Sequence, residues 1–551
     1  MEPLKIIPLG GLGEFGLNMM LIEYGDDAIA VDCGLMFPDA HLLGIDLVIP
    51  DISYLLESKT KLKAIVLTHA HEDHVGALPF VLKHFDVPIY GTKLTLGLLA
   101  NKLKEHDLED SVEIHEITAG APWRIGPFMV EGIRVTHSLM DCLALAVETP
   151  LGTVIHTGDF KIDNTPMDGE MFDFQRFAAY GEKGVLLLMS DSTNVERRGH
   201  TPSERDVGTN LEQIIAKSTG KVLVSTFSSS IPRIQQVVEI AERCDRRVVL
   251  SGRSMIRNCE VASDLGYLNM PRGFMNDSEK WQGLAPDRLL FLTTGSQGEP
   301  MSVLHRVALN DHKTLKVDSG DTVILSSKFI PGNEKVISNL INHLYRRGAE
   351  VHYEKVSEIH VSGHASQEEL KTMLQLTRPR YFVPIHGEYR HLVRHRRLAQ
   401  EVGIPEENCF LMDDGDVLEL TSRGAEKVKP IQVGRVFVDG KGVGDVGDAV
   451  IRDRRHLSED GMILAVIAIH QQSGDIVAGP DLISRGFMLA EESEEVMESA
   501  KQAVLIALGN LNRETRTDPE ELKEEVRRVL RRFFRKKLER RPVVLPYIIE
   551  T

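Results

Sequence analysis

The stretch LKAIVLTHAHEDH (residues 62–74) joins a short apolar run to a cluster of histidines and acids. The apolar half predicts a buried β-strand. Directly after it, His69, His71, Asp73 and His74 offer four possible metal ligands. Imidazoles and a carboxylate suit Zn²⁺ or a similar ion. A regular helix could not aim all four side chains at one point, so we expect a loop at the mouth of the strand and a helix afterwards, over VGALPFVLKHF.

Further candidate ligands stand at the ends of later predicted strands. They are His137 in IRVTHS, Asp159 in IHTGDF and His386 in VPIHGEY. The alternative to a metal site is an exposed histidine-rich turn, and that alternative does not account for these downstream residues.

The order of predicted elements indicates an α/β protein. A β-hairpin is expected over residues 18–34, and more strands follow up to VLLLMSDST (185–193). From about residue 205, strands alternate with helices, which is typical of a parallel sheet with crossover helices. The Gly-rich stretch 433–450 predicts a linker or hairpin. Beyond it we expect a small α/β unit with the strand GMILAVIAIH and a long helical C-terminal stretch.

An early glycine motif has a different interpretation. GLGEFG (residues 11–16) matches the GxGxxG pattern of dinucleotide-binding proteins. That interpretation needs a helix to follow, but NMMLIEYGDDAIAVD predicts a hairpin. We therefore favour a turn in which glycines let two backbones approach closely.

Composition narrows the class of protein. The 551 residues carry 64 Lys and Arg against 81 Asp and Glu, a formal net charge of −17. This argues against nucleic-acid binding over the whole surface, although a local basic site remains compatible with it. The five cysteines are scattered and form no CxxC pair, which is typical of a reducing compartment. The sequence also shows no signal-peptide pattern and no long apolar run. We therefore expect a cytoplasmic protein with no membrane association.

The ligand pattern resembles the metallo-β-lactamase superfamily. That resemblance implies an αββα sandwich with two Zn²⁺ ions, for which Mn²⁺ or Mg²⁺ are possible substitutes. One ion would be held by His69, His71 and His137, and the other by Asp73, His74 and His386, with Asp159 bridging. The two ions would share a water whose pKa is lowered, and Asp73 would belong to the catalytic centre.

The long segment between Asp159 and His386 resembles the inserted domain of the β-CASP nucleases. TTGSQGEP, SSKFIPGNE and GPDLISRGF are similar to segments of the ribonuclease J family. The resemblance implies a metallo-β-lactamase domain in two parts (1–204 and 368–432), a β-CASP domain (205–367), a linker (433–450) and a C-terminal domain (451–551).

Two serine-rich turns predict an anion site. Ser228–Ser230 stand before a helix with Pro232 near its first turn, and HVSGH (360–364) leads into a capping-box pattern at Ser366. Free N–H groups at a helix start bind anions, although simple N-capping by serine is the alternative. By resemblance, the turns form a pocket for an RNA 5′-monophosphate, for which the candidate residues are Ser229, Ser230, His360, Ser362, Gly363 and His364.

Two more roles rest on the resemblance. His364 would act as general acid towards the leaving 3′-oxygen, unless it only orders its loop. Asp191 would orient a metal-ligand histidine, unless it only caps a turn. A structural cation such as Ca²⁺ is a further expectation, with Asp46 and Asp439 as ligands.

The C-terminal run VRRVLRRFFRKKLERR (526–541) is strongly basic. Its apolar residues recur at helical spacing, which predicts a packed amphipathic helix whose basic flank could contact RNA, a partner protein or a membrane surface.

The expected function is cleavage of single-stranded RNA, 5′→3′ from 5′-monophosphate ends, with internal cleavage also plausible. The expected assembly is a homodimer or homotetramer, and proteins of an RNA-decay complex are possible partners. The alternatives are a catalytically idle scaffold subunit and a β-CASP nuclease that acts on DNA.

Overall fold

The computed structural model describes residues 2–39, 41–270, 281–330, 333–488 and 490–551. The chain divides into two compact units. One contains Met1–Phe37 and Val48–Val436, and the other contains Pro38–Leu47 and Phe437–Thr551. No helix within these described ranges is both long and apolar enough to cross a membrane.

Two sheets form the core of the first unit. The eight-stranded sheet has the order β22 (Gly424–Val428), β21 (Val417–Thr421), β1 (Leu4–Gly10), β3 (Met19–Tyr24), β4 (Asp27–Val31), β6 (Lys61–Val66), β7 (Ile89–Gly91), β8 (Ile114–Glu116). The six-stranded sheet has the order β19 (Tyr381–Ile385), β13 (Val185–Asp191), β12 (Gly152–His156), β11 (Leu143–Thr149), β10 (Phe128–Arg134), β9 (Trp123–Ile125). Side chains from both sheets share one apolar core, and examples are Ile6, Ile29, Val66, Leu145 and Val383.

The helices of this sandwich are α1 (Ser53–Glu57), α2 (Glu72–Val75), α3 (Leu78–Val81), α4 (Lys93–Glu105), α5 (Phe174–Lys183), α11 (Gln367–Thr377) and α12 (Tyr389–Glu401). Apolar residues of α5, α11 and α12 pack on the outer face of the six-stranded sheet. The helix expected over VGALPFVLKHF is mostly absent, because only α3 forms there. A short helix begins earlier, at Glu72, inside the histidine motif.

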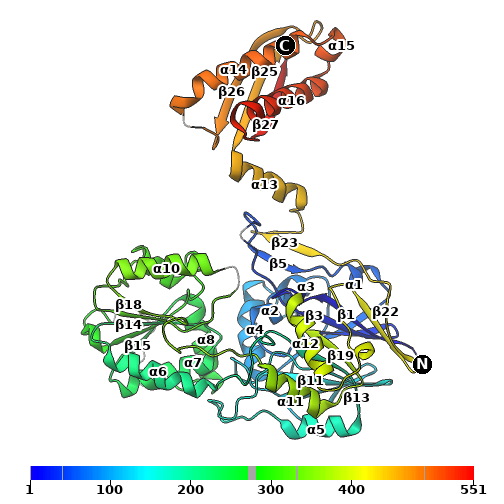
Figure 1. Ribbon diagram of the computed structural model, residues 1–551, viewed down its shortest axis with the longest axis vertical. Coiled ribbons are helices and arrows are strands. Elements are labelled where there is room, and N and C mark those ends of the chain that lie inside the picture. Colours follow the sequence, from blue (N-terminus) through cyan, green and yellow to red (C-terminus); the bar gives the residue numbers. More distant parts are fainter. Residues whose placement is uncertain (1, 40, 271–280, 331–332, 489) are drawn as a thin grey trace. The chain divides into compact units, whose positions relative to one another are not determined.

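A parallel five-stranded sheet is formed by the segment of the chain that separates the two parts of the sandwich in the sequence. Its order is β15 (Arg247–Ser251), β16 (Leu289–Thr293), β14 (Val222–Ser225), β17 (Thr322–Leu325), β18 (Glu350–His352). One face packs against α6 (Glu204–Lys217), α7 (Ile231–Arg243) and α8 (Arg253–Asp264), and the other against α9 (Val303–Ala308) and α10 (Glu334–Arg346). Figure 1 shows α6 and α7 on one side of this sheet and α10 on the other. The alternation of strands and helices expected from residue 205 onwards is confirmed.

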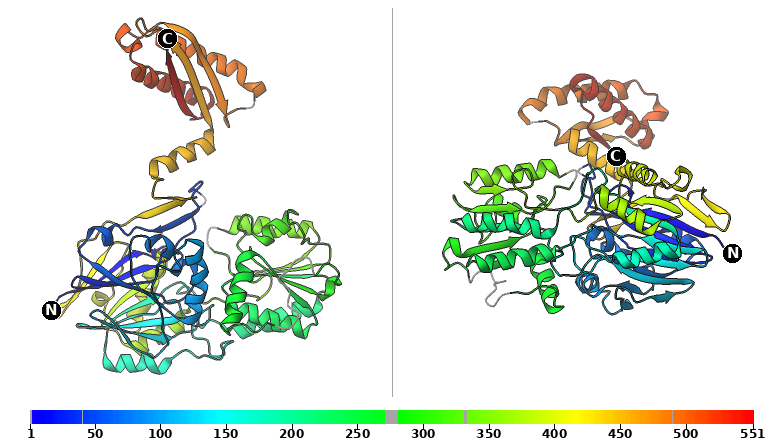
Figure 2. Two further views of the ribbon diagram at one scale, coloured as in Figure 1. Left: turned by 180° about the vertical axis from the view of Figure 1, so that it is seen from behind. Right: turned by 60° about the horizontal axis from the view of Figure 1, so that its bottom comes forward.

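The second unit contains a short hairpin and a three-stranded sheet. In the hairpin, β23 (Arg435–Asp439) pairs with β24 (Gly442–Val443). The sheet has the order β26 (Ile476–Arg485), β25 (Met462–Ile469), β27 (Val543–Glu550). Its helices are α13 (Asp448–Asp460), α14 (Ala490–Gly509), α15 (Arg513–Arg516) and α16 (Pro519–Leu538), and α14 and α16 lie along the sheet in both views of Figure 2. The terminal strand β27 was not expected from the sequence.

The glycine motif forms a turn between strands, and no helix follows it. After β2 (Leu12–Gly13) the chain enters β3, which pairs with β4 as the expected hairpin. A Cβ at Gly11 would lie 2.5 Å from Asn18 Oδ1, so the turn depends on the absence of a side chain. Leu12 pairs with Gly387 of β20 (Gly387–Glu388), directly after His386. The motif therefore supports a candidate metal ligand.

Candidate metal centre and substrate pocket

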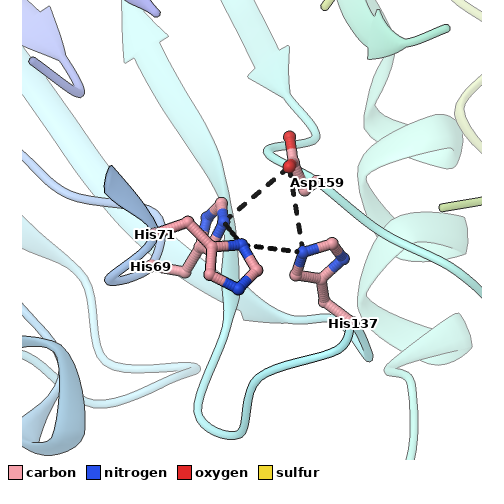
Figure 3. A group of neighbouring side chains, drawn as sticks. All are labelled: His69, His71, His137 and Asp159. Carbon is pink, nitrogen blue, oxygen red and sulfur yellow. Dashed lines mark hydrogen bonds and ion pairs between the residues drawn. The ribbon is translucent and has the colours of Figure 1, made fainter. Parts of the chain in front are cut away.

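The first group of candidate ligands gathers four side chains from three loops. His69 and His71 follow β6, His137 follows β10 and Asp159 follows β12. Their donor atoms lie within 4.8 Å of one another and point to a common centre (Figure 3). His69 Nε2 and His137 Nε2 lie 3.0 and 3.2 Å from His71 Nδ1, and each lies within 3.8 Å of Asp159 Oδ2.

The second group shares Asp159 with the first. Asp73 and His74 come from α2, and His386 follows β19. His74 Nε2 lies 3.3 Å from Asp159 Oδ2, and His386 Nε2 lies 3.3 Å from Asp73 Oδ2 and 3.5 Å from Asp159 Oδ1. Thus the seven side chains singled out in the sequence meet at one place, with Asp159 common to both groups.

The local structure of the histidine motif differs from the expected loop. His69 and His71 lie in the loop, but Asp73 and His74 lie in the first turn of α2. A helical turn places consecutive residues about 100° apart, which lets these two side chains reach the second group while the loop supplies the first.

The electrostatics of the two groups differ. Burial, together with the neighbouring imidazoles, lowers the pKa of His69 and His137 well below the ordinary value, so both are neutral and able to bind a metal. Burial also lowers the pKa of His386, but Asp159, Asp73 and Asp191 outweigh it and raise that pKa to about 9. The surrounding histidines outweigh burial and lower the pKa of Asp159, so the carboxylate is ionised.

The donor set fits divalent metal ions. A tetrahedral site with Zn–N bonds of about 2.0–2.1 Å has donor atoms about 3.3–3.4 Å apart. The separations of 3.0–3.8 Å in both groups bracket that value. Imidazoles and carboxylates are also the ligand types that zinc and related ions take.

Two supporting residues, Asp32 and Thr193, were missed in the sequence. Asp32, at the end of β4 with φ of 63°, accepts the N–H and the hydroxyl of Thr68 at 2.8 Å and lies 2.8 Å from His74 Nδ1. Thr193 Oγ1 lies 2.7 Å from His386 Nδ1. Such partners fix the orientation of a ligand ring. The only sequence signal for Asp32 is an acid at a strand end.

Asp191 contacts two histidines of the site. Its Oδ2 lies 2.8 Å from His364 Nδ1, whereas its Oδ1 accepts the Thr193 N–H at 2.9 Å and lies 3.7 Å from His386 Nδ1. The carboxylate therefore holds His364 and also caps a turn, and Thr193 is the nearer partner of the metal-ligand candidate His386.

The loop 359–366 joins the metal centre to the predicted phosphate pocket. His137 Nδ1 lies 2.7 Å from the carbonyl oxygen of Gly363, so a candidate ligand is oriented by the loop backbone. The carbonyl oxygen of His364 accepts hydrogen bonds from Asn194 Nδ2 at 3.0 Å and Thr201 Oγ1 at 2.8 Å. The capping box expected at Ser366 is present.

The serine turn begins α7 as expected. Ser230 is the N-cap residue, but its hydroxyl makes no capping hydrogen bond and instead donates to Ser138 O at 3.4 Å. Simple serine capping therefore does not explain this turn. His360 lies near several cations: burial lowers its pKa strongly, and Arg233, Lys328, Lys161 and Arg197 lower it further. A positive potential at His360 would attract an anion.

The two residues expected to hold a structural cation have other partners. Asp439 forms an ion pair with Arg454, and Asp46 Oδ2 accepts the N–H of Gly440 at 2.8 Å. Neither belongs to a group of three or more possible metal ligands within the described ranges. The cation there stays a prediction.

The fold and the site define a class of protein. A metallo-β-lactamase model matches residues 12–193, and a model of the Zn-dependent metallo-hydrolase RNA specificity domain matches residues 348–412. Models of the ribonuclease J β-CASP and C-terminal domains match residues 219–344 and 449–551. The chain is thus a metallo-β-lactamase-fold hydrolase with an inserted β-CASP domain and a C-terminal domain, as expected.

Full-length relatives give the family. The chain is 42% identical to ribonuclease J of Thermus thermophilus, over 100% of this chain and 96% of that one. It is 41% identical to ribonuclease J 1 of Streptococcus pyogenes (99% and 97% covered) and 38% identical to ribonuclease J2 of Bacillus subtilis (100% and 99%). The chain belongs to the ribonuclease J family, and with this site it is a metal-dependent nuclease.

The fold is similar to that of a solved structure. It is a protein of unknown function from Enterococcus faecalis, with a TM-score of 0.52 and 17% identity, covering 76% of this chain and all of that one.

Proposed function

We propose that the protein is a zinc-dependent ribonuclease that degrades and matures single-stranded RNA in the cytoplasm. The observation that supports it most is the meeting of seven His and Asp side chains, from residues 69 to 386, in two groups that share Asp159. Two divalent ions bound there would supply a water nucleophile at neutral pH and neutralise charge on the phosphodiester.

The direction of cleavage is proposed from the neighbouring pocket. Ser229, Ser230, His360, Ser362 and Gly363 would hold the RNA 5′-monophosphate and so position the first phosphodiester at the metal centre. Support comes from the uncapped start of α7 and from the cations around His360. This arrangement favours 5′→3′ exonuclease action on 5′-monophosphate ends, with internal cleavage as a second activity.

His364 is the proposed general acid. Its Nδ1 lies 2.8 Å from Asp191 Oδ2, which fixes the ring. Its Nε2 has no hydrogen-bond partner among the residues that the structure describes, so this atom can hold the proton that the leaving 3′-oxygen takes. Asp191 would hold His364 in place, and Asp73 would complete the second ligand group with His74, His386 and Asp159.

The remaining expectations complete the proposal. Mn²⁺ or Mg²⁺ would replace zinc, and Asp46 and Asp439 would hold a Ca²⁺ ion once Arg454 moves away. The proposed domains are the metallo-β-lactamase domain (1–204 and 368–432), the β-CASP domain (205–367), the linker (433–450) and the C-terminal domain (451–551). The proposed working form is a homodimer or homotetramer, and the proposed partners are proteins of an RNA-decay complex. A scaffold without activity is the second candidate, but complete donor groups favour an enzyme.

The test uses one 3′-labelled RNA prepared with a 5′-monophosphate, a 5′-triphosphate or a 5′-hydroxyl. We expect the monophosphate form to be degraded fastest, with the labelled strand shortened from its 5′ end and no shortening in a chelator. His71→Ala should abolish hydrolysis in every form. Equal rates on all three ends would contradict the end preference, and full activity of the His71→Ala protein would refute the metal mechanism.

A further inference from the structure

The basic part of α16 is the strongest charged feature outside the metal centre. On this helix Leu522, Val526, Val529, Leu530 and Phe534 are buried in the core of the second unit. The opposite face of the last two turns carries four exposed cations. We call Arg531, Arg532, Arg535 and Lys536 the α16 strip.

The strip differs from the rest of the helix in how its charges are paired. The preceding cations each form an ion pair three residues away: Lys523 with Glu520, Arg527 with Glu524 and Arg528 with Glu525. The four cations of the strip form no ion pair or side-chain hydrogen bond with any residue whose side chain the structure describes.

Helix stability alone does not explain the strip. Cations near a helix C-terminus interact favourably with the helix dipole, but the effect falls off within the last turn. Arg531 and Arg532 precede the last turn. Arg531 with Arg535, and Arg532 with Lys536, are also like-charge neighbours at i,i+4, which destabilise a helix. Because these four cations lower the stability of the helix, their presence at these positions requires a reason other than stability.

The burial of the helix restricts what can bind to the strip. An amphipathic helix that lies in a membrane surface must insert its apolar face, but here that face is already packed in the protein core. A polyanion needs only the exposed face. Three of the four cations are arginines, whose planar fork binds phosphate oxygens in pairs.

We propose that the α16 strip is an auxiliary binding surface for the phosphate backbone of RNA, separate from the end-recognition pocket. RNA is favoured over an acidic protein because three of the four cations are arginines, whose planar forks match phosphate oxygens, and because the chain belongs to a family of ribonucleases. The proposal rests on the proposed function, since the bound RNA is the substrate.

The test measures salt dependence of binding. The full-length protein carrying R531Q, R532Q, R535Q and K536Q is titrated against a 5′-monophosphorylated single-stranded RNA, in chelator to prevent cleavage, at several KCl concentrations. Each lost phosphate contact lowers the slope of log K against log salt by about 0.7, so we expect the slope to fall by up to about 3.

The matched control removes four cations that have partners in the same unit. Arg455, Lys501, Lys523 and Arg527 form ion pairs, and their replacement by Gln should leave the slope as in the wild type. A second variant, R531K with R532K and R535K, keeps the charges and should keep most of the slope, which separates loss of charge from damage to the helix.

The outcomes distinguish this proposal from the proposed function. If the Gln variant binds RNA with the wild-type slope, the strip proposal is wrong. If that variant instead loses binding only to a poly-glutamate peptide, the strip is a protein surface and the proposal is again wrong. If the wild-type protein with metal restored hydrolyses no RNA, the proposed function fails, whatever the strip binds.

Discussion

Replacement of Gly363 by Ala tests whether the pocket loop holds the metal centre together. An added Cβ would lie 2.6 Å from both Nδ1 and Cε1 of His137 and 2.9 Å from the Cβ of Ser138. Ordinary contacts between such atoms are about 3.5–4.0 Å. The imidazole would therefore have to withdraw by about 1 Å.

His137 cannot move by this distance and still bind a metal ion. The ring is buried, and its Nδ1 is held 2.7 Å from the Gly363 carbonyl oxygen. Metal–ligand distances tolerate only about ±0.2 Å, so a displacement of this size removes His137 as a ligand. Loss of ligand orientation alone costs about 10–100-fold in metal affinity, and we expect at least that.

The assay compares metal affinity and fold. Purified protein is dialysed against buffered free Zn²⁺, and the bound metal is measured by inductively coupled plasma spectrometry. Overpacking should cost about 1–3 kcal/mol of unfolding free energy, so circular dichroism should still show a folded chain. Gly283→Ala is the control, because its Cβ would meet no atom within 4 Å. Wild-type metal affinity and RNA hydrolysis in Gly363→Ala would refute the reasoning.

Three further perturbations probe other parts of the first unit. Arg233→Met leaves the buried carboxylate of Glu204 without its guanidinium partner, so the free energy of unfolding measured in urea should fall by about 3–5 kcal/mol. Arg243→Met on the same helix removes only the exposed ion pair with Glu212, so that free energy should fall by about 0–1 kcal/mol. Equal losses in the two variants would contradict this reasoning. Burial and a nearby acid raise the pKa of Asp414 to about 7, so folding takes up a proton and stability falls as pH rises from about 4 to 7. Asp414→Asn should therefore raise Tm relative to the wild type at pH 8 and not at pH 4, and a pH-independent difference would count against it. Thr193→Val should lower metal affinity by about 10–100-fold because it removes the partner of His386, and Thr193→Ser should restore it; an unchanged affinity in the Val variant would show that the hydroxyl is dispensable.

Much of the metal site could be predicted because most of its ligand-type residues stand close together in the sequence. Four ligand-type residues follow one apolar strand, and the other three candidates stand at strand ends, where the ends of neighbouring strands meet. Asp32 and Thr193 could not be found in this way. Each is one polar residue at the end of a strand, and its importance arises only from the sheet register that brings it to His74 or His386.

The fold, too, could be predicted only where the sequence carries a local pattern. Alternating strands and helices predicted the parallel sheet, and the hairpin turn at Gly25 predicted β3 and β4. The strand β27 was missed because Pro546 interrupts an otherwise strand-like run. A proline is tolerated there since β27 lies at the edge of its sheet. The grouping of Pro38–Leu47 with the second unit depends on long-range contacts, such as Asp46 N–H with Val438 O at 2.9 Å, which leave no local pattern.

The position of β1 between β3 and β21 has a consequence during synthesis of the chain. β3 leaves the ribosome soon after β1, but β21 follows some 400 residues later, which takes about 20–80 s at ~5–20 residues per second. Throughout that interval one edge of β1 is open to wrong pairing, and the nascent chain must be protected there. His386 also emerges late, so a ribosome must translate beyond residue 386 before a nuclease site that could attack RNA exists.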